Sequence, residues 1–279
     1  MDVSDQQGGT KTTISNSSDS EAGYRLGPNY TSLRACFILA CKYYRNYETL
    51  IPMYVENICN FYPDALIVLV DNNSHYFDDV RNQLVDYKNV VILTNNIPCK
   101  FEIGAYKVGI TYLLDNHIQD IDYVFFTQDN YILKNKLNLH MLKQEQITAS
   151  ALFAFLYLNP VTQQNFYSPT SQHVLQKIGL QDSIHKLALC WCHSFVLHFS
   201  KIGDFFEITK DIIIVNRPES NDSERYLSGI LYYLNDSKIY QIDDDISYES
   251  LSFDELKKYG GKQYFIKFHQ SKTEQTPDA

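Results

Sequence analysis

Oxygen-bearing side chains follow two of the apolar runs in this sequence, at positions where a carboxylate can bind a ligand. The first cluster begins with Asp71, directly after the run 65–70, and reads Asp-Asn-Asn-Ser. A carboxylate at the carboxyl end of a strand can accept hydrogen bonds from a base imide or a ribose hydroxyl. The same residue types also shape turns by bonding their own backbone, so a turn-forming role is the alternative for Asp71 and Asn72.

The second cluster, Thr-Gln-Asp-Asn at 127–130, follows the apolar run 123–126. A divalent cation that bridges a diphosphate needs one or two protein carboxylates besides phosphate and water oxygens, and Asp129 could supply one. We expect Asn130 to be a second metal ligand and Gln128 to face the bound ligand. The alternative is a strand-to-helix turn in which Asp129 or Asn130 is a helix cap.

A lysine lies near the start of a predicted helix between these clusters. The sequence 100–107, Lys-Phe-Glu-Ile-Gly-Ala-Tyr-Lys, opens this helix, and Gly104 allows close approach of the backbone. Helix N-termini favour phosphate, and Lys107 would add a point charge there; a solvated surface lysine is the alternative. We also expect Cys41 and Tyr43, which follow the first predicted strand, to line the same ligand site.

Alternating strands and helices must position these residues. Apolar runs at 35–40, 65–70, 90–93 and 123–126 are typical of strands covered on both faces, and apolar stripes with helical spacing separate them. Such alternation forms parallel βαβ units, whose ligand sites lie beyond the carboxyl ends of the strands. The sequence therefore predicts an α/β fold with a mostly parallel central sheet flanked by helices.

The second half of the sequence is less regular. Residues 151–158 form an apolar run and residues 194–199 a predicted strand, and apolar spacing predicts helices at 202–206 and 224–234. We expect this half to form a smaller mixed region that faces the acceptor.

Length and composition predict one main domain. A chain of 279 residues can bury one sizeable core, which we expect over residues 32–270, with a nucleotide-binding half at 32–135 and an acceptor-side half at 136–270. Residues 1–31 hold few apolar side chains and predict a disordered tail, and residues 271–279 predict a flexible one.

Charge and hydropathy narrow the class of partner. The net charge of -9 argues against nucleic acid or an anionic membrane surface as a partner. The longest apolar runs are far shorter than the roughly 20 residues that span a bilayer, and the N-terminus has no hydrophobic signal core. We therefore expect a soluble, cytoplasmic protein without a membrane span.

The two strand-end clusters and the helix start between them together resemble the glycosyltransferases of the GT-A fold, especially family 2 and the relatives in rhamnan-type polysaccharide synthesis. The resemblance covers residues 35–133 and, with fewer matches, the chain up to residue 234. Residues 67–74 look like the family's strand that ends in the aspartate holding the nucleotide base. The helix start 104–109 is similar to the one after the third strand, and 123–130 occupies the slot of the metal-binding Asp-x-Asp motif.

This resemblance implies a nucleoside-diphosphate sugar as donor, with uridine favoured, and a glycan or other hydroxyl acceptor. It also implies Mn²⁺ or Mg²⁺, although Gln128 and Asn130 stand where the family has its outer acids and leave only Asp129. The alternative function is a catalytically degenerate domain of this fold that binds a glycan or a partner protein.

The resemblance places the remaining chemistry in the second half. Inverting transfer needs a general base that takes the acceptor hydroxyl proton. Glu224 resembles the family's base segment, with Asp222 as the second candidate, whereas Asn221 and Glu224 together also match a helix capping box. We expect Trp191 and His193 to contact the acceptor sugar; a core tryptophan and a structural histidine are the alternatives.

Overall fold

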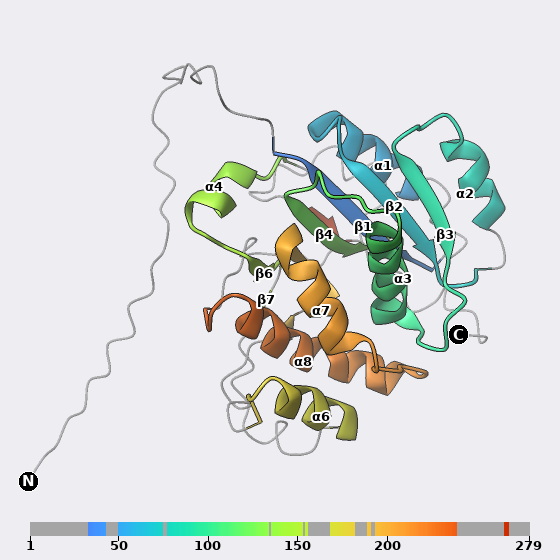
Figure 1. Ribbon diagram of the computed structural model, residues 1–279. Helices are drawn as coiled ribbons and strands as arrows, with labels where there is room; N and C mark the ends of the chain where they lie inside the picture. The colour runs from blue at the N-terminus through green and yellow to red at the C-terminus, as the bar shows by residue number, and fades with distance from the viewer. Residues whose placement is uncertain are drawn as a thin grey trace, which may run out of the picture. The chain divides into compact units, whose positions relative to one another are not determined.

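A six-stranded mixed sheet with helices on both faces is the centre of the computed structural model (Figure 1). The structure describes residues 33–42, 50–74, 77–133, 135–152, 154–155, 168–181, 189–190, 193–238 and 265–267. Both predicted tails, 1–31 and 271–279, lie outside the described residues, as do Tyr43 and Trp191.

The sheet has the strand order β3-β2-β1-β4-β9-β6. Its first four strands pair in parallel, whereas β9 runs antiparallel to both of its neighbours, β4 and β6. The strands are β1 (Ala35–Cys41), β2 (Leu66–Asp71), β3 (Val90–Thr94), β4 (Tyr123–Gln128), β6 (Ala149–Ala151) and β9 (Phe195–His198). The mostly parallel α/β architecture with a smaller mixed region, which the GT-A resemblance implied, is confirmed.

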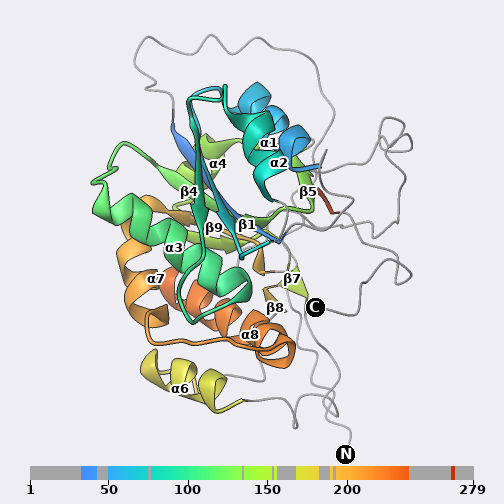
Figure 2. The same ribbon diagram turned by 90° about the vertical axis from the view of Figure 1, so that its right-hand side faces the viewer.

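Helices cover the two faces of this sheet as separate layers (Figures 1 and 2). One face packs against α1 (Leu50–Phe61) and α2 (Phe77–Leu84). The other packs against α3 (Phe101–Asp115), α7 (Ile202–Thr209) and α8 (Arg217–Leu234). The remaining helical elements are α4 (Leu139–Gln144), α6 (Pro169–Lys177) and the 3₁₀ turn η3 (Phe199–Lys201). Two further sheets have two strands each. One pairs β5 (Tyr131–Leu133) with β10 (Phe265–Lys267), and the other pairs β7 (Ala154–Phe155) with β8 (Leu189–Cys190).

The central strand β1 shows why its sequence is continuously apolar. Successive side chains of a strand point to opposite faces. Phe37 and Leu39 pack with the core under α1 and α2, whereas Ile38 and Ala40 pack with the core under α3, α7 and α8. Every residue of β1 is buried, so neither face tolerates a polar residue before the strand ends.

Helix α3 approaches the sheet closely because it carries glycine at two contact points. A Cβ atom at Gly109 would lie 2.6 Å from Cγ2 of Ile38 in β1. A Cβ atom at Gly104 would lie 2.0 Å from the carbonyl oxygen of Cys99, in the segment before the helix. Side chains at these positions would push α3 outward, so the two glycines fix its distance from β1 and the preceding loop.

The second half differs from the sequence prediction in one helix boundary. Helix α8 begins at Arg217, not at Glu224, because the Asn216 side chain accepts a hydrogen bond from the Glu219 backbone N–H at 3.0 Å and Pro218 occupies the first turn. The apolar run 151–158 is partly strand, in β6 and β7, and its last three residues lie outside the described part. Among the described helices, none is both long and apolar enough to cross a membrane.

Candidate active site

The carboxyl ends of β2, β1 and β4 lie side by side and carry the residues predicted from the sequence. In the parallel register, Cys41 of β1 is opposite Asp71 of β2, and Ala40 is opposite Gln128 of β4. The backbone N–H of Asp129 donates to the carbonyl oxygen of Ala40 at 3.1 Å, which holds the turn after β4 against the end of β1. The structure thus places the two predicted clusters on either side of one strand end.

Asp71 and Asp129 both lie close to the Cys41 thiol. Burial raises the pKa of this thiol, and the negative charges of Asp129 and Asp71 raise it further. Asp71 is only 4% exposed and Asp129 only 6%. Cys41 itself is fully buried, and its role as a ligand contact stays a prediction.

Asp71 also has the turn-forming role that the sequence left open. Its Oδ1 accepts a hydrogen bond from the backbone N–H of Ser74 at 3.0 Å. Burial raises the pKa of the Asp71 carboxyl, and the hydrogen bonds from Ser74 and the charges of Arg81 and Lys42 reduce this effect without cancelling it. A carboxylate has several acceptor sites, so shaping the turn leaves capacity for a ligand.

Asp129 and Asn130 form the turn between β4 and β5, not the helix cap considered as an alternative. Oδ2 of Asp129 accepts a hydrogen bond from the backbone N–H of Lys42 at 2.7 Å. Over the described ranges, no group of three or more His, Cys, Asp or Glu side chains is placed to hold a metal ion. Carboxylate and amide oxygens, such as those of Asp129 and Asn130, are ligands that hard divalent cations accept.

The Lys107 side chain lies against the segment that joins α7 and α8, and its role in diphosphate binding stays a prediction. Its ammonium donates hydrogen bonds to the carbonyl oxygens of Lys210 at 2.7 Å and Ile212 at 2.8 Å. Burial lowers the pKa of this amino group. Lys107 therefore ties α3 to the segment that joins α7 and α8. Lys42 is exposed and lies within electrostatic range of Asp71, so it is the better placed cation.

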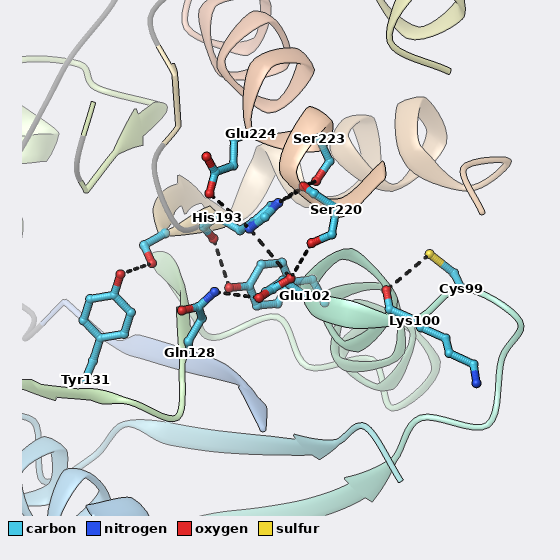
Figure 3. A network of polar contacts seen from close by, with 11 residues as sticks. Cys99, Lys100, Glu102, Gln128, Tyr131, His193, Ser220, Ser223 and Glu224 are labelled. Carbon is cyan, nitrogen blue, oxygen red and sulfur yellow. Dashed lines mark hydrogen bonds and ion pairs between the residues drawn. The ribbon is translucent and has the colours of Figure 1, made fainter. Parts of the chain in front are cut away.

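A network of polar side chains begins at Gln128 and centres on Glu102 in the first turn of α3 (Figure 3). The amide of Gln128 donates to Oε1 of Glu102 at 2.7 Å, and the Ser220 hydroxyl donates to Oε2 at 3.1 Å. Burial would raise the pKa of the Glu102 carboxyl, but His193, the Glu102 backbone N–H, Arg217 and Ser220 together hold it below the ordinary value of 4.5. Glu102 is therefore ionised at neutral pH.

His193 lies between Glu102 and Glu224. Its Nδ1 is 3.7 Å from Oε2 of Glu102 and 3.9 Å from Oε1 of Glu224. On the other side of the ring, Nε2 is 2.9 Å from the carbonyl oxygen of Ser220 and 2.5 Å from the Ser223 hydroxyl (Figure 3). The residue is only 2% exposed, and its role as an acceptor contact stays a prediction.

The two candidate bases have different environments. The Asp222 carboxylate is occupied by other side chains: its Oδ2 accepts hydrogen bonds from the hydroxyls of Ser168 and Ser171, and Oδ1 pairs with Arg225 at 3.3 Å. These contacts attach the N-terminus of α6 to α8, and the role of Asp222 as a base stays a prediction. Glu224 lies in the second turn of α8, beyond the capping residues, so the capping-box alternative for it is wrong.

Three residues of this site escaped the sequence analysis. Glu102 and Ser220 come from helices 118 positions apart in the sequence, and no local pattern connects them. An acidic residue in the first turn of a helix is ordinarily explained by its favourable interaction with the helix dipole. The sequence therefore gave no reason to expect that Glu102 is buried among polar side chains. Lys42 directly follows the first strand, and this position was the only feature of the sequence that could have identified it as a site residue.

Comparison with known proteins gives only remote similarities. No protein-family model and no curated protein matches the sequence. Among solved structures, the chain is similar to the galactosyltransferase LgtC in complex with donor and acceptor sugar analogues, with 12% identity and a TM-score of 0.40 over 85% of this chain and 87% of that chain. An active-site mutant of LgtC matches with 12% identity and a TM-score of 0.42 over 86% and 88% of the two chains.

The apo structure of the bifunctional glycosyltransferase WbbM is a further similar structure. It matches with 11% identity and a TM-score of 0.45, and the match covers 88% of this chain. It covers 47% of the WbbM chain, so this chain spans about half of that protein's length.

Proposed function

We propose that this protein transfers a sugar from a nucleoside-diphosphate sugar, with uridine as the favoured base, to a hydroxyl group of a glycan or similar acceptor. The observation that carries the proposal is the placement of two buried carboxylates, Asp71 and Asp129, on either side of the end of β1. Ligand sites of open α/β sheets lie at the carboxyl ends of such strands. The order of these residues along the chain is also the one that the GT-A resemblance requires.

Each end of the nucleotide then has its own group of residues. Asp71 and Asn72 hold the base or ribose by accepting hydrogen bonds. Asn72 is kept in place by Asn95, whose amide donates to Oδ1 of Asn72 at 2.8 Å. Lys42 and Asp129 belong to the diphosphate end, where the ammonium offsets the phosphate charge.

Asp129, with Asn130 beside it, would hold Mn²⁺ or Mg²⁺ together with the diphosphate. A bound divalent cation neutralises the charge that develops on the leaving diphosphate. Asp129 is well suited to this role because the Lys42 backbone N–H already fixes the direction of its carboxylate. The Gln128 side chain points away from the diphosphate, toward Glu102, and connects the donor end to the network on α3 and α8.

Glu224 is the proposed general base of an inverting transfer. Its carboxylate takes the proton of the acceptor hydroxyl while that oxygen bonds to the anomeric carbon. The bond from the anomeric carbon to the diphosphate oxygen breaks on the opposite face, and its electron pair leaves with the diphosphate. The side chain of Glu224 is 19% exposed, so it is more accessible to an acceptor than Glu102 at 12% or His193 at 3%.

Assays of sugar transfer and donor hydrolysis over a panel of nucleotide sugars, each with and without Mn²⁺, test this function. We expect turnover with at least one uridine diphosphate sugar and inversion at the anomeric carbon in the product, measured by NMR. Retention would rule out Glu224 as the base of an inverting step. The absence of binding to every nucleotide sugar would contradict the proposed function.

A further inference from the structure

The last residues of three neighbouring strands form a row on one face of the sheet. Cys41 of β1 is opposite Asp71 of β2, and Asp71 is opposite Thr94 of β3. Side chains two positions apart along a strand point to the same face. The residues two positions before these ends in β2 and β3, Leu69 and Ile92, pack with the core under α1 and α2. The side chains of Asp71 and Thr94 therefore point to the face that α1 and α2 cover.

Asp129 continues this row on the other side of β1. Gln128, the last residue of β4, is opposite the residue before Cys41, so Asp129 follows in line with Cys41. The negative charges of Asp71 and Asp129 both act on the Cys41 thiol, which lies between them in the row. The order across the strand ends is Asp129, Cys41, Asp71, Thr94. A nucleotide that lies along this row with its diphosphate at Asp129 reaches Asp71 next and Thr94 last.

An arginine from α2 reaches the Thr94 end of the row. Nη2 of Arg81 donates a hydrogen bond to the Thr94 hydroxyl at 3.2 Å. The guanidinium carbon lies 5.6 Å from the centroid of the Phe77 ring, and its charge acts on the Asp71 carboxyl. Nε of Arg81 is 3.8 Å from Oδ1 of Asp78, but the Asp78 side chain is 96% exposed, so water screens this pair.

These contacts use a small part of the hydrogen-bonding capacity of Arg81. A guanidinium carries five N–H donors in one plane and no acceptor. Over the described part of the chain, the Thr94 hydroxyl is the one group that accepts a hydrogen bond from it. The side chain is 36% exposed, so donors remain for a ligand at the strand ends. Thr94 and Phe77 already hold the group in place, so it would lose little conformational freedom on binding.

We propose that Arg81 binds the base of the nucleotide and donates a hydrogen bond to a carbonyl oxygen of that base. The inference rests on the proposed function, which puts the diphosphate at Asp129 and the ribose or base at Asp71. Uracil carries a ring N–H between two carbonyl oxygens, so Asp71 can accept from the N–H while Arg81 donates to a neighbouring carbonyl. Adenine has no carbonyl, and its amino group would direct a donor at the donors of Arg81. Arg81 is then a specificity-determining residue for bases with an N–H beside a carbonyl.

Attachment of α2 to β3 is the competing role for Arg81. In that role, the hydrogen bond to Thr94 is all that matters, and Arg81→Met and Thr94→Val, which both remove it, should affect nucleotide binding equally. If Arg81 contacts the base, Thr94→Val keeps the guanidinium and loses only its support. Arg81→Met should then weaken binding much more than Thr94→Val does.

Calorimetry of the full chain with uridine diphosphate and with adenosine diphosphate, each in the presence of Mn²⁺, tests the proposal. The two ligands share the ribose and the diphosphate and differ in the base. We expect Arg81→Met to lower the affinity for uridine diphosphate at least about tenfold, as loss of a hydrogen bond to a charged group does. The affinity for adenosine diphosphate should change less than about twofold, since adenine offers Arg81 no acceptor carbonyl. Arg81→Lys keeps the charge without the planar set of donors and should recover a part of the loss.

Arg34→Met is the matched control. Arg34 directly precedes β1, at the opposite edge of the sheet, and forms an ion pair with Asp120. Its side chain is 40% exposed, close to the 36% of Arg81. We expect Arg34→Met to bind uridine diphosphate as the unaltered protein does. Urea unfolding of each variant, performed beside the calorimetry, identifies a loss of affinity that comes from unfolding.

The outcomes separate this inference from the proposed function. Unchanged affinity for uridine diphosphate in a folded Arg81→Met protein would overturn the inference, and so would an equal loss for both nucleotides or an equal loss in Thr94→Val. If Arg81→Met does not fold, unchanged affinity in Arg81→Lys would overturn it. In each of these cases the unaltered protein still binds uridine diphosphate, so the proposed function stands. If the unaltered protein binds no nucleoside diphosphate, the proposed function fails, and the role of Arg81 fails with it.

Discussion

Replacing Gly104 with alanine tests how closely α3 must approach the segment before it. The new Cβ would lie 2.0 Å from the Cys99 carbonyl oxygen, whereas such contacts are essentially never below 3.0 Å, so the backbone must shift by about 1 Å. The Asn95 amide donates to the same carbonyl at 3.0 Å and to Asn72 at 2.8 Å, so this shift also disturbs the proposed base subsite.

The expected cost follows from these contacts. Overpacking costs about 1 to 3 kcal/mol, and loss of a buried hydrogen bond adds about 1 kcal/mol. Alanine regains about 1 kcal/mol from its higher helix propensity. We therefore expect Gly104→Ala to lower the free energy of unfolding by about 1 to 3 kcal/mol in urea titrations.

Gly203→Ala is the matched control. Gly203 lies in α7, and a Cβ atom there would have no neighbour within 4 Å, so alanine should leave stability unchanged or raise it by up to about 1 kcal/mol. A Gly104→Ala protein as stable as the Gly203→Ala protein would refute the close packing of α3 described above.

Four further predictions concern charged residues at the site and around it. Asp222→Ala should lower the free energy of unfolding by about 1 to 3 kcal/mol, because it removes the acceptor of two serine hydroxyls. Its nucleotide affinity should stay unchanged, and weaker nucleotide binding by the folded variant would contradict this prediction. Lys42→Met should weaken nucleoside-diphosphate binding in calorimetry, whereas Lys107→Met should lower stability alone, and the reverse result would restore Lys107 to the phosphate end. Burial raises the folded-state pKa of Asp71, so its ionisation lowers the stability of the protein above pH 3.8, the ordinary pKa of the group. Asp71→Asn should therefore be more stable than the unaltered protein at pH 7, but not below pH 3.8. Glu102→Gln should show the opposite sign, since the folded-state pKa of Glu102 is lowered: the stability it contributes above 4.5 should disappear as the pH falls through the folded-state pKa. Urea titrations over pH measure both differences, and equal signs for the two variants would contradict the assigned environments.

The sequence was sufficient for the parts of the fold that local patterns determine. A strand covered on both faces must be apolar throughout, so runs such as 35–40 and 65–70 indicated a mostly parallel sheet, which the structure confirms. Polar residues that follow such a run lie at or just beyond the strand end. For this reason Asp71 and Asp129 could be assigned to the carboxyl ends of two strands before their contacts were known.

The features that the sequence did not reveal depend mostly on contacts between residues distant in the sequence. Lys107 has the spacing of a surface lysine, and only the carbonyls of residues 210 and 212, more than 100 positions away, show where its ammonium lies. The start of α8 was ambiguous because two Asn-x-x-Glu patterns occur there. Pro218, which is favoured in a first helical turn, distinguishes Asn216 with Glu219 as the true cap.

Binding of uridine diphosphate, measured by calorimetry with and without Mn²⁺, tests the strand-end site most directly. We predict binding to the unaltered protein, stronger with Mn²⁺, and affinities at least about tenfold lower for Asp71→Asn and for Asp129→Asn, since each loses a charged hydrogen-bond acceptor. The Gly203→Ala protein should bind as the unaltered protein does. Unchanged affinity in both aspartate variants, or no binding of any nucleoside diphosphate, would contradict the placement of a nucleotide at the ends of β2, β1 and β4.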